Sequence, residues 1–292
     1  MQRDYKNLCN ALEQANVIDK RYCHPFWLAT KNKMRTLLLG KPNQKILHER
    51  CITHTMVRRG IGATQKYEIT YLKYCTFKQT KKLLSRFAET DFLKIPRECK
   101  EFNCTTNSLG HLFYAAKIFE TLEHEKEINT IVEFGGGYGN LARIFKMTLP
   151  HATIIIFDLP EAIALQSLFL NSTLESADII IHTKLPTDFK TGSIHLVPVF
   201  FIDNIEIDAD VFVSTFGISE APVFVQQKIA AKAFFNAQTC YLAGQLKGWS
   251  GQFEQHNLLF GEIKNNYSWI QCQPFHADIG NLLNYELLAA NI

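Results

Sequence analysis

Four glycines within the five positions 135–139 constrain the fold of this chain more than any other feature. The apolar run before them, Thr130–Phe134, is typical of a buried strand, and apolar residues at helical spacing follow directly. Glycine permits backbone angles that other residues disfavour, and it lacks the Cβ that would keep a ligand away from the turn. The N–H groups at the start of the next helix attract a negative group. The segment therefore predicts a ligand-binding turn between a strand and a helix.

A second strand-like run, Ala152–Asp158, ends in an acid at the place where nucleotide-binding sheets hold ribose hydroxyls, about 20 residues after the glycine turn. Leu159 would then pack beside an adenine. Dinucleotide-binding proteins share this logic, but their GxGxxG/A fingerprint needs a small residue where this chain has Asn140. The glycines instead follow GxGxG with Glu133 two residues ahead, which favours S-adenosylmethionine. A purely structural turn is the simpler alternative, and Asp158 in register argues against it.

The residues expected to bind this cofactor lie at the carboxyl ends of predicted strands, where open α/β sheets bind their ligands. They are Glu133, Gly135, Gly136, Gly137, Tyr138, Gly139, Asp158, Leu159, Ser214 and Thr215.

Strand-like runs alternate with helical ones after residue 108, which predicts a parallel sheet covered on both faces. The six expected parallel strands are Thr130–Phe134, Ala152–Asp158, Asp178–Thr183, Leu196–Phe201, Asp210–Phe216 and Thr239–Gln245, and the helices are Gly139–Leu149, Pro160–Leu170 and Ala221–Ala237. The last two runs, Ser268–Phe275 and Leu282–Ala290, leave no room for a crossover helix and should pair antiparallel. We expect an α/β fold: a doubly wound, mostly parallel, seven-stranded Rossmann-like methyltransferase sheet with a terminal antiparallel hairpin.

The N-terminal third reads differently, as short helical pieces interrupted by proline and glycine. We expect a mainly helical region over residues 1–108, serving as a lid, for acceptor recognition or for dimerisation, and a cofactor-binding domain over 109–292. Ser108 is a candidate N-cap for the helix that carries Leu112 and Phe119. A homodimer is therefore one of the open possibilities.

Composition narrows the class of protein. The formal net charge is only +3, which gives no sign of a nucleic-acid partner. No apolar run approaches the roughly 18 residues of a membrane span, and no signal peptide is recognisable. Eight cysteines without a CxxC pair are typical of free thiols in a reducing compartment. We expect a cytoplasmic protein that contacts neither nucleic acid nor membrane.

With these motifs, the chain resembles the bacterial family of sugar O-methyltransferases found among polysaccharide and glycan genes. The resemblance rests on Glu133–Phe145, on Phe157–Glu161 with Ala164-Leu165-Gln166, and on Asp210–Glu220, and it covers about residues 105–292. The first two segments are also similar to plant-type small-molecule O-methyltransferases. The resemblance implies methyl transfer from S-adenosylmethionine to a hydroxyl of a small molecule, with a sugar or glycan precursor as the expected acceptor. Family members commonly have Trp-Ala-Leu where this chain has Phe216-Gly217-Ile218, so the acceptor side is expected to differ.

A hydroxyl is a weak nucleophile, so a general base or a metal is usually needed. Glu220, which follows the expected strand Asp210–Phe216, is one candidate for the base or for an acceptor-hydroxyl ligand. Alternatively, it caps the next helix. His256 is the other, because related O-methyltransferases place a catalytic histidine in the corresponding loop. His276 and Asp278 are weaker candidates for the same site.

Metal-like clusters are unconvincing. His48, Cys51 and His54 would fan across a helix rather than share one face, and no matching fourth ligand follows. The set of Cys272 with His276 and Asp278 has no better spacing. Magnesium near Asp203, Asp208 and Asp210 stays open, although no spacing demands it. We therefore predict no metal site.

The basic helical face of Lys78, Lys81, Lys82 and Arg86 is either a solvated surface or, if the N-terminal region closes over the site, a holder for an anionic acceptor. A DNA amino-methyltransferase lacks its Asn/Asp-Pro-Pro-aromatic turn here. An inactive methyltransferase-like binding module and, less well supported, a dinucleotide-dependent oxidoreductase remain as alternative functions.

Overall fold

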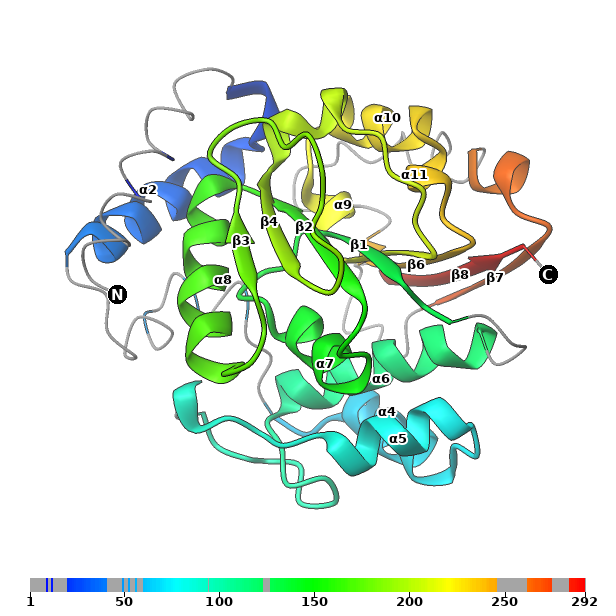
Figure 1. Cartoon of the computed structure of the whole chain (residues 1–292). Coiled ribbons are helices and arrows are strands. Elements are labelled where there is room, and N and C mark those ends of the chain that lie inside the picture. Colours follow the sequence, from blue (N-terminus) through cyan, green and yellow to red (C-terminus); the bar gives the residue numbers. More distant parts are fainter. Residues whose placement is uncertain are drawn as a thin grey trace.

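The structure is a computed structural model that describes residues 9, 12, 20–40, 49, 52, 56, 60–93, 95–122, 127–245, 262–274 and 284–291. Its centre is a twisted sheet with helices packed on both faces (Figure 1). The strands are β1 (Thr130–Phe134), β2 (Thr153–Asp158), β3 (Ile179–Ile181), β4 (Ile194–Pro198), β5 (Val211–Thr215), β6 (Thr239–Gln245), β7 (Trp269–Pro274) and β8 (Asn284–Ala290). They are ordered β3-β4-β2-β1-β5-β6-β8-β7 across the sheet.

Strands β3, β4, β2, β1, β5 and β6 pair in parallel, and β8 pairs antiparallel with both β6 and β7. This is the expected doubly wound, Rossmann-like α/β architecture with a terminal antiparallel hairpin. The expected count of seven strands is wrong, because eight form among the described residues. Each of the eight strand-like runs of the sequence forms a strand, and the short β3, within the expected run Asp178–Thr183, pairs with β4 at the sheet edge through Ile179–Ile181.

Helices fill the layers on either side of the sheet. The α-helices are α2 (Pro25–Leu39), α4 (Ala63–Tyr74), α5 (Lys78–Arg86), α6 (Thr106–Thr121), α7 (Asn140–Thr148), α8 (Pro160–Thr173), α9 (Gly217–Glu220), α10 (Val223–Ala231) and α11 (Ala233–Asn236), and the 3-10 turns are η1 (Lys20–Tyr22), η3 (Asp91–Leu93) and η4 (Val199–Asn204). Helices α6, α7 and α8 pack on one face, while α10 and α11 pack on the other. Helices α4 and α5 lie outside α6.

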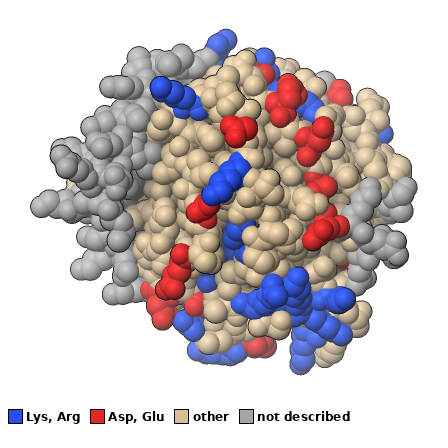
Figure 2. Space-filling model, in the orientation of Figure 1, with Lys and Arg blue, Asp and Glu red and all other residues tan. Residues whose placement is uncertain are grey.

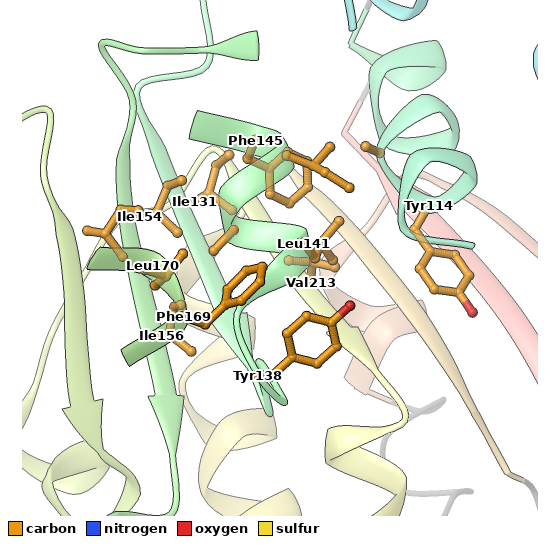
Figure 3. Packing of buried hydrophobic residues seen from close by; sticks show 14 of the residues in the cluster. Tyr114, Ile131, Tyr138, Leu141, Phe145, Ile154, Ile156, Phe169, Leu170 and Val213 are labelled. Atoms are coloured by element: carbon orange, nitrogen blue, oxygen red, sulfur yellow. The ribbon is translucent and has the colours of Figure 1, made fainter. Parts of the chain in front are cut away.

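Alternating side chains along the strands give the sheet two apolar layers. In β1, Ile131 belongs to the layer beneath α6 and α7, and Val132 belongs to the opposite layer beneath α10. Figure 3 shows the first layer, in which the Tyr138 and Phe169 rings meet edge to face with centroids 4.9 Å apart. The central strands β1, β2, β4, β5 and β6 are therefore buried on both faces, as their apolar content predicts, whereas β3 at the sheet edge is half-buried.

Three local expectations need correction. The predicted strand Leu196–Phe201 is displaced, because β4 ends at Pro198 and η4 follows. The predicted helix Ala221–Ala237 divides into α10 and α11, because residues 233–236 have positive φ angles of 47–58°. Helix α6 begins at Thr106, and the Thr105 hydroxyl accepts the Ser108 N–H at 3.1 Å. Thr105 is thus the N-cap in place of Ser108.

The N-terminal part contributes helices to both ends of the molecule. Helices α4 and α5 pack against α6, and α5 also contacts α7. Helix α2 packs separately against α8. Within the part of the chain that the structure describes, no helix is long and apolar enough to cross a membrane.

Candidate cofactor and acceptor site

The glycine turn after β1 is shaped by positive φ angles and by one close backbone contact. Gly135 has φ +77°, and a Cβ added to it would lie 2.6 Å from the Cα of Gly217. Gly137 has φ +58°, and an added Cβ there would meet no atom within 4 Å. Gly136 and Gly139 complete the turn, with Gly139 as the N-cap of α7. The turn thus packs against α9 on one side and faces open space at Gly137.

Glu133, in β1, lies beneath this turn. Its side chain is buried, and among the residues that the structure describes none donates a hydrogen bond to its Oε2 atom. Burial, and next the negative charge of Asp158, raise the pKa of Glu133 to about 8. A buried carboxylate without a donor is costly, so this oxygen fits a group that arrives with a ligand, such as an ammonium.

Asp158 ends β2 beside the turn, because Phe157 pairs with Phe134 in the sheet. Its Oδ1 atom accepts the Leu159 N–H at 2.7 Å, and its Oδ2 atom accepts from Gln166 Nε2 at 2.7 Å. Burial raises the pKa of Asp158 to about 7, although these hydrogen bonds and those of the turn act in the opposite direction. Leu159 is half-buried and packs on the layer beneath α10.

Gln166 was not predicted to have a role at the site. It is fully buried on α8, and its Nε2 atom also donates to the carbonyl oxygen of Gly137 at 3.1 Å. The amide therefore ties the acid after β2 to the turn after β1. A buried glutamine within an apolar helix was the available signal in the sequence.

Tyr138 contributes to packing from inside the turn. Its ring is buried against Phe169, and its hydroxyl accepts a hydrogen bond from Asn107 Nδ2 at 2.7 Å. The tyrosine thus anchors the glycine turn to α6.

Ser214 and Thr215 close β5 next to the turn. The Ser214 hydroxyl donates to the Phe134 carbonyl at 2.9 Å and accepts the Ile218 N–H at 2.9 Å. It therefore links the ends of β1 and β5 to α9. Thr215 is half-buried, and Phe216 after it has φ +68°, a strained angle for a residue with a side chain.

Glu220 ends α9 and is half-buried. Its Oε2 atom accepts a hydrogen bond from Trp27 Nε1 at 3.2 Å, across 193 residues of chain. Burial raises the pKa of Glu220 to about 7; the Trp27 hydrogen bond lowers it, and the charge of Asp158 adds to the increase. The N-cap of α10 is Pro222, without a side-chain hydrogen bond, so the structure gives the capping alternative no support.

The segment of residues 20–39 lies over the carboxyl edge of the sheet, and four of its side chains contact three carboxylates that follow strands. Tyr22 donates to Asp203 Oδ2 at 2.7 Å, Trp27 donates to Glu220, and Lys31 and Arg35 pair with Glu161, the lysine at 3.9 Å. None of these contacts was predicted. Together they attach η1 to the segment after β4, and α2 to the segments after β5 and β2.

Several residues considered from the sequence lie outside the described residues: His256, His276, Asp278, His48, Cys51 and His54. Asp210 lies at the opposite edge of the sheet, where its Oδ2 accepts the Asn129 and Thr130 N–H groups before β1 begins. Asp208 pairs with Asn236. Both residues precede β5, so neither lies at the carboxyl end of that strand, where the candidate site is. The described residues contain no cluster of three or more potential metal ligands.

The basic face of α5 is also distant from the glycine turn. Arg86, at the end of α5, donates to the carbonyl of Thr148, the last residue of α7, whose first turn follows Gly139. Figure 2 shows lysine and arginine gathered over the region of α4 and α5. These charges lie on the outer surface, away from the strand ends that carry the candidate site.

Comparisons with known proteins agree with this geometry. Residues 90–190, which include the turn, Asp158 and Gln166, match the O-methyltransferase domain family. No curated protein matches the chain. Together with the glycine turn, the match identifies a methyltransferase that uses S-adenosylmethionine. The residues of the site fit this cofactor. Glu133 Oε2 is buried and accepts no hydrogen bond from the described residues, and the space at Gly137 is open.

Similar solved structures include methyltransferases. The magnesium protoporphyrin IX methyltransferase of Synechocystis, with bound S-adenosylmethionine, has a TM-score of 0.43 at 7% identity over 80% of this chain and 100% of that one. A SAM-dependent methyltransferase of Methanosarcina mazei has a TM-score of 0.41 at 12% sequence identity, and the match covers 59% of this chain and 97% of that one. EvdMO1 has a TM-score of 0.41 at 11% sequence identity. The match covers 61% of this chain but only 41% of EvdMO1, so this chain spans less than half the length of that protein. At TM-scores below 0.5 these likenesses say nothing of substrate.

Proposed function

We propose that this protein is an S-adenosylmethionine-dependent O-methyltransferase that acts on a hydroxyl of a small molecule, a sugar or glycan precursor. One observation carries the proposal. Glu220, whose pKa is raised to about 7, stands at the end of α9 beside the cofactor turn, and α9 packs on that turn through Gly217. A general base works best when its pKa is near the working pH. Glu220 therefore suits the removal of a proton from a hydroxyl.

The cofactor would be held by residues from three strand ends. Glu133 would receive the ammonium group, the glycine turn the methionyl carboxylate, and Asp158 the ribose hydroxyls. Leu159 would lie beside the adenine. Ser214 would act indirectly through its hydrogen bonds, and Thr215 from the edge of the site. When bound, S-adenosylmethionine supplies a methyl group whose C–S bond breaks as the acceptor oxygen takes it.

The chain's own part in the reaction is to position the acceptor and to move one proton. The hydroxyl proton would pass to Glu220 Oε1, since Oε2 already accepts from Trp27. His256 stays an alternative base. Residues 109–292 would bind the cofactor, and the region 1–108 would contribute to acceptor binding.

Calorimetric titration with S-adenosylmethionine, S-adenosylhomocysteine and NAD tests the cofactor. We expect the two adenosyl ligands to bind and NAD to fail, with binding lost in Asp158→Ala and kept in Asp91→Ala, whose exposed side chain pairs with Arg97. Transfer of radiolabelled methyl to a panel of sugars then tests the reaction, and Glu220→Gln should abolish it while keeping the cofactor. Cofactor binding without transfer to any hydroxyl would favour the inactive binding module, and NAD binding would favour an oxidoreductase.

A further inference from the structure

Helix α2 presents one face to the candidate site. Trp27, Lys31 and Arg35 are four residues apart, so they share that face on successive turns. All three contact carboxylates from the edge of the sheet, Glu220 in one case and Glu161 in the other two. The helix is thus attached at two places on either side of the end of β1.

The Trp27–Glu220 contact differs in kind from the two ion pairs. An indole has a single N–H donor, which here occupies one carboxylate oxygen of Glu220 and leaves Oε1 outside the hydrogen bond. Both side chains are half-buried, so each retains surface for a ligand. The pairing fixes the direction of the carboxylate and sets an apolar ring beside it.

We propose that the acceptor binds between α2 and α9, with Trp27 both as the wall against which the acceptor packs and as the positioning residue that orients Glu220. This inference rests on the proposed function. It assigns acceptor recognition to α2, a role that neither the glycine turn nor the cofactor residues can fill. An aromatic face beside a carboxylate matches a ring that has one apolar face and hydroxyls at its edge.

The charges of α2 narrow the class of acceptor. A carboxylate with an indole could also hold a cation. However, Lys31 and Arg35 lie on the same helical face as Trp27, and a cationic acceptor would approach both. Glu161 and Glu220, when both are ionised, offset the two positive charges, so the face carries no net charge and offers no strong attraction for an anion either. The acceptor that fits is a neutral cyclic polyol.

The first test reads the pair without any acceptor. Tryptophan emission of the protein saturated with S-adenosylhomocysteine is followed from pH 5 to pH 9. We expect a transition near pH 7 as Glu220 ionises beside the indole, and we expect it to vanish in Trp27→Phe and in Glu220→Gln, whose amide oxygen still accepts the indole N–H. Trp269→Phe, which removes a half-buried tryptophan from β7, should keep the transition. The same transition in Trp27→Phe would overturn the inference.

The second test measures methyl transfer to neutral sugars and to an alcohol that carries a quaternary ammonium. Two variants distinguish the contribution of the Trp27 ring from that of its N–H group. Trp27→Phe keeps a ring, so it should lower kcat/KM about tenfold and move its pH profile upward, because the hydrogen bond that lowers the pKa of Glu220 is lost. Trp27→Ala should also raise the acceptor KM about tenfold or more, with the KM for S-adenosylmethionine unchanged. Preference for the ammonium alcohol would overturn the assigned class.

The outcomes distinguish this inference from the function on which it rests. If the wild-type protein fails to bind S-adenosylhomocysteine, the proposed function falls. If the protein binds it and methylates a sugar while Trp27→Phe and Trp27→Ala match the wild type in emission and in kinetics, only the role of Trp27 and α2 falls.

Discussion

Gly135 and Gly217 meet backbone to backbone: a Cβ on Gly217 would lie 2.7 Å from the Cα of Gly135 and 2.5 Å from the Phe134 carbonyl oxygen. The turn that would hold the cofactor and the helix that carries Glu220 are therefore packed without any side chain between them. This contact explains why glycine stands at position 217, where the similar family commonly has alanine. It also sets the position of Glu220 relative to the turn.

Gly217→Ala should disturb this contact. Because the added methyl group would overlap backbone atoms that cannot rotate away, we expect a loss of about 1–3 kcal/mol in the free energy of unfolding. Urea denaturation measures the loss. Gly137→Ala is the matched comparison, since its Cβ meets open space and its positive φ costs about 1–2 kcal/mol. Its main effect should be weaker binding of S-adenosylhomocysteine. If the Gly217→Ala protein were as stable as the wild type, α9 would not be held in close contact with the glycine turn.

Ser214→Ala should act on stability more than on cofactor contacts. The variant would leave the Ile218 N–H without its buried acceptor, at a cost of about 1–3 kcal/mol. Thr215→Val is the control, because Thr215 is half-buried at the strand end and would face the cofactor directly. We expect thermal denaturation to detect the first change and calorimetry the second. If Ser214→Ala unfolds like the wild type but binds S-adenosylhomocysteine weakly, Ser214 is a direct ligand.

The sequence predicted those parts of the fold that depend on local patterns. Strand β1 has its expected bounds, because apolar β-branched residues ending in glycine allow little else. Asp158 meets the turn because parallel neighbours align their carboxyl ends. The pattern failed at Ala233–Asn236, where apolar residues suitable for a helix adopt left-handed angles. The expected strand Asp178–Thr183 does form, but it shortens to the three residues Ile179–Ile181 of β3.

The acceptor side could not be predicted in the same way. Trp27 and Glu220 are 193 residues apart, and nothing at either position indicates the other. Their contact depends on how α2 folds back over the sheet, which is a tertiary property. Gln166 could have been recognised as a polar residue in an apolar helix, but its two partners, Asp158 and Gly137, become evident only when the strand ends meet.

Glu133→Gln should stabilise the protein at high pH. The folded carboxyl has a pKa of about 8 against its usual 4.5, so proton binding favours the folded state at low pH. That contribution is lost as the pH rises from about 4.5 to about 8, whereas glutamine does not titrate. We expect the variant's advantage in unfolding free energy to grow over this window to on the order of 1–3 kcal/mol. Urea denaturation at pH 5 and pH 9 measures it.

The same substitution should weaken the binding of S-adenosylmethionine, since the amide offers no charge to its ammonium group. Asp158 and Glu220 also have raised pKa values, with the same sign, and they are present in both proteins, so the comparison reports Glu133 together with its repulsion of Asp158. An advantage that is equal at pH 5 and pH 9 would mean that Glu133 ionises normally in the folded protein.

Glu161→Gln should release α2 from α8. Lys31 is buried, so it would lose its counter-charge in a place that water barely reaches, at a cost of up to about 3 kcal/mol. Hydrogen exchange should rise across α2 and stay low in β1 and β2. Asp91→Asn breaks the exposed pair with Arg97 and should change nothing measurable. Because α2 also carries Trp27, Glu161→Gln should reduce acceptor affinity while cofactor affinity holds. Fast exchange in α2 of the wild-type protein would contradict the attachment.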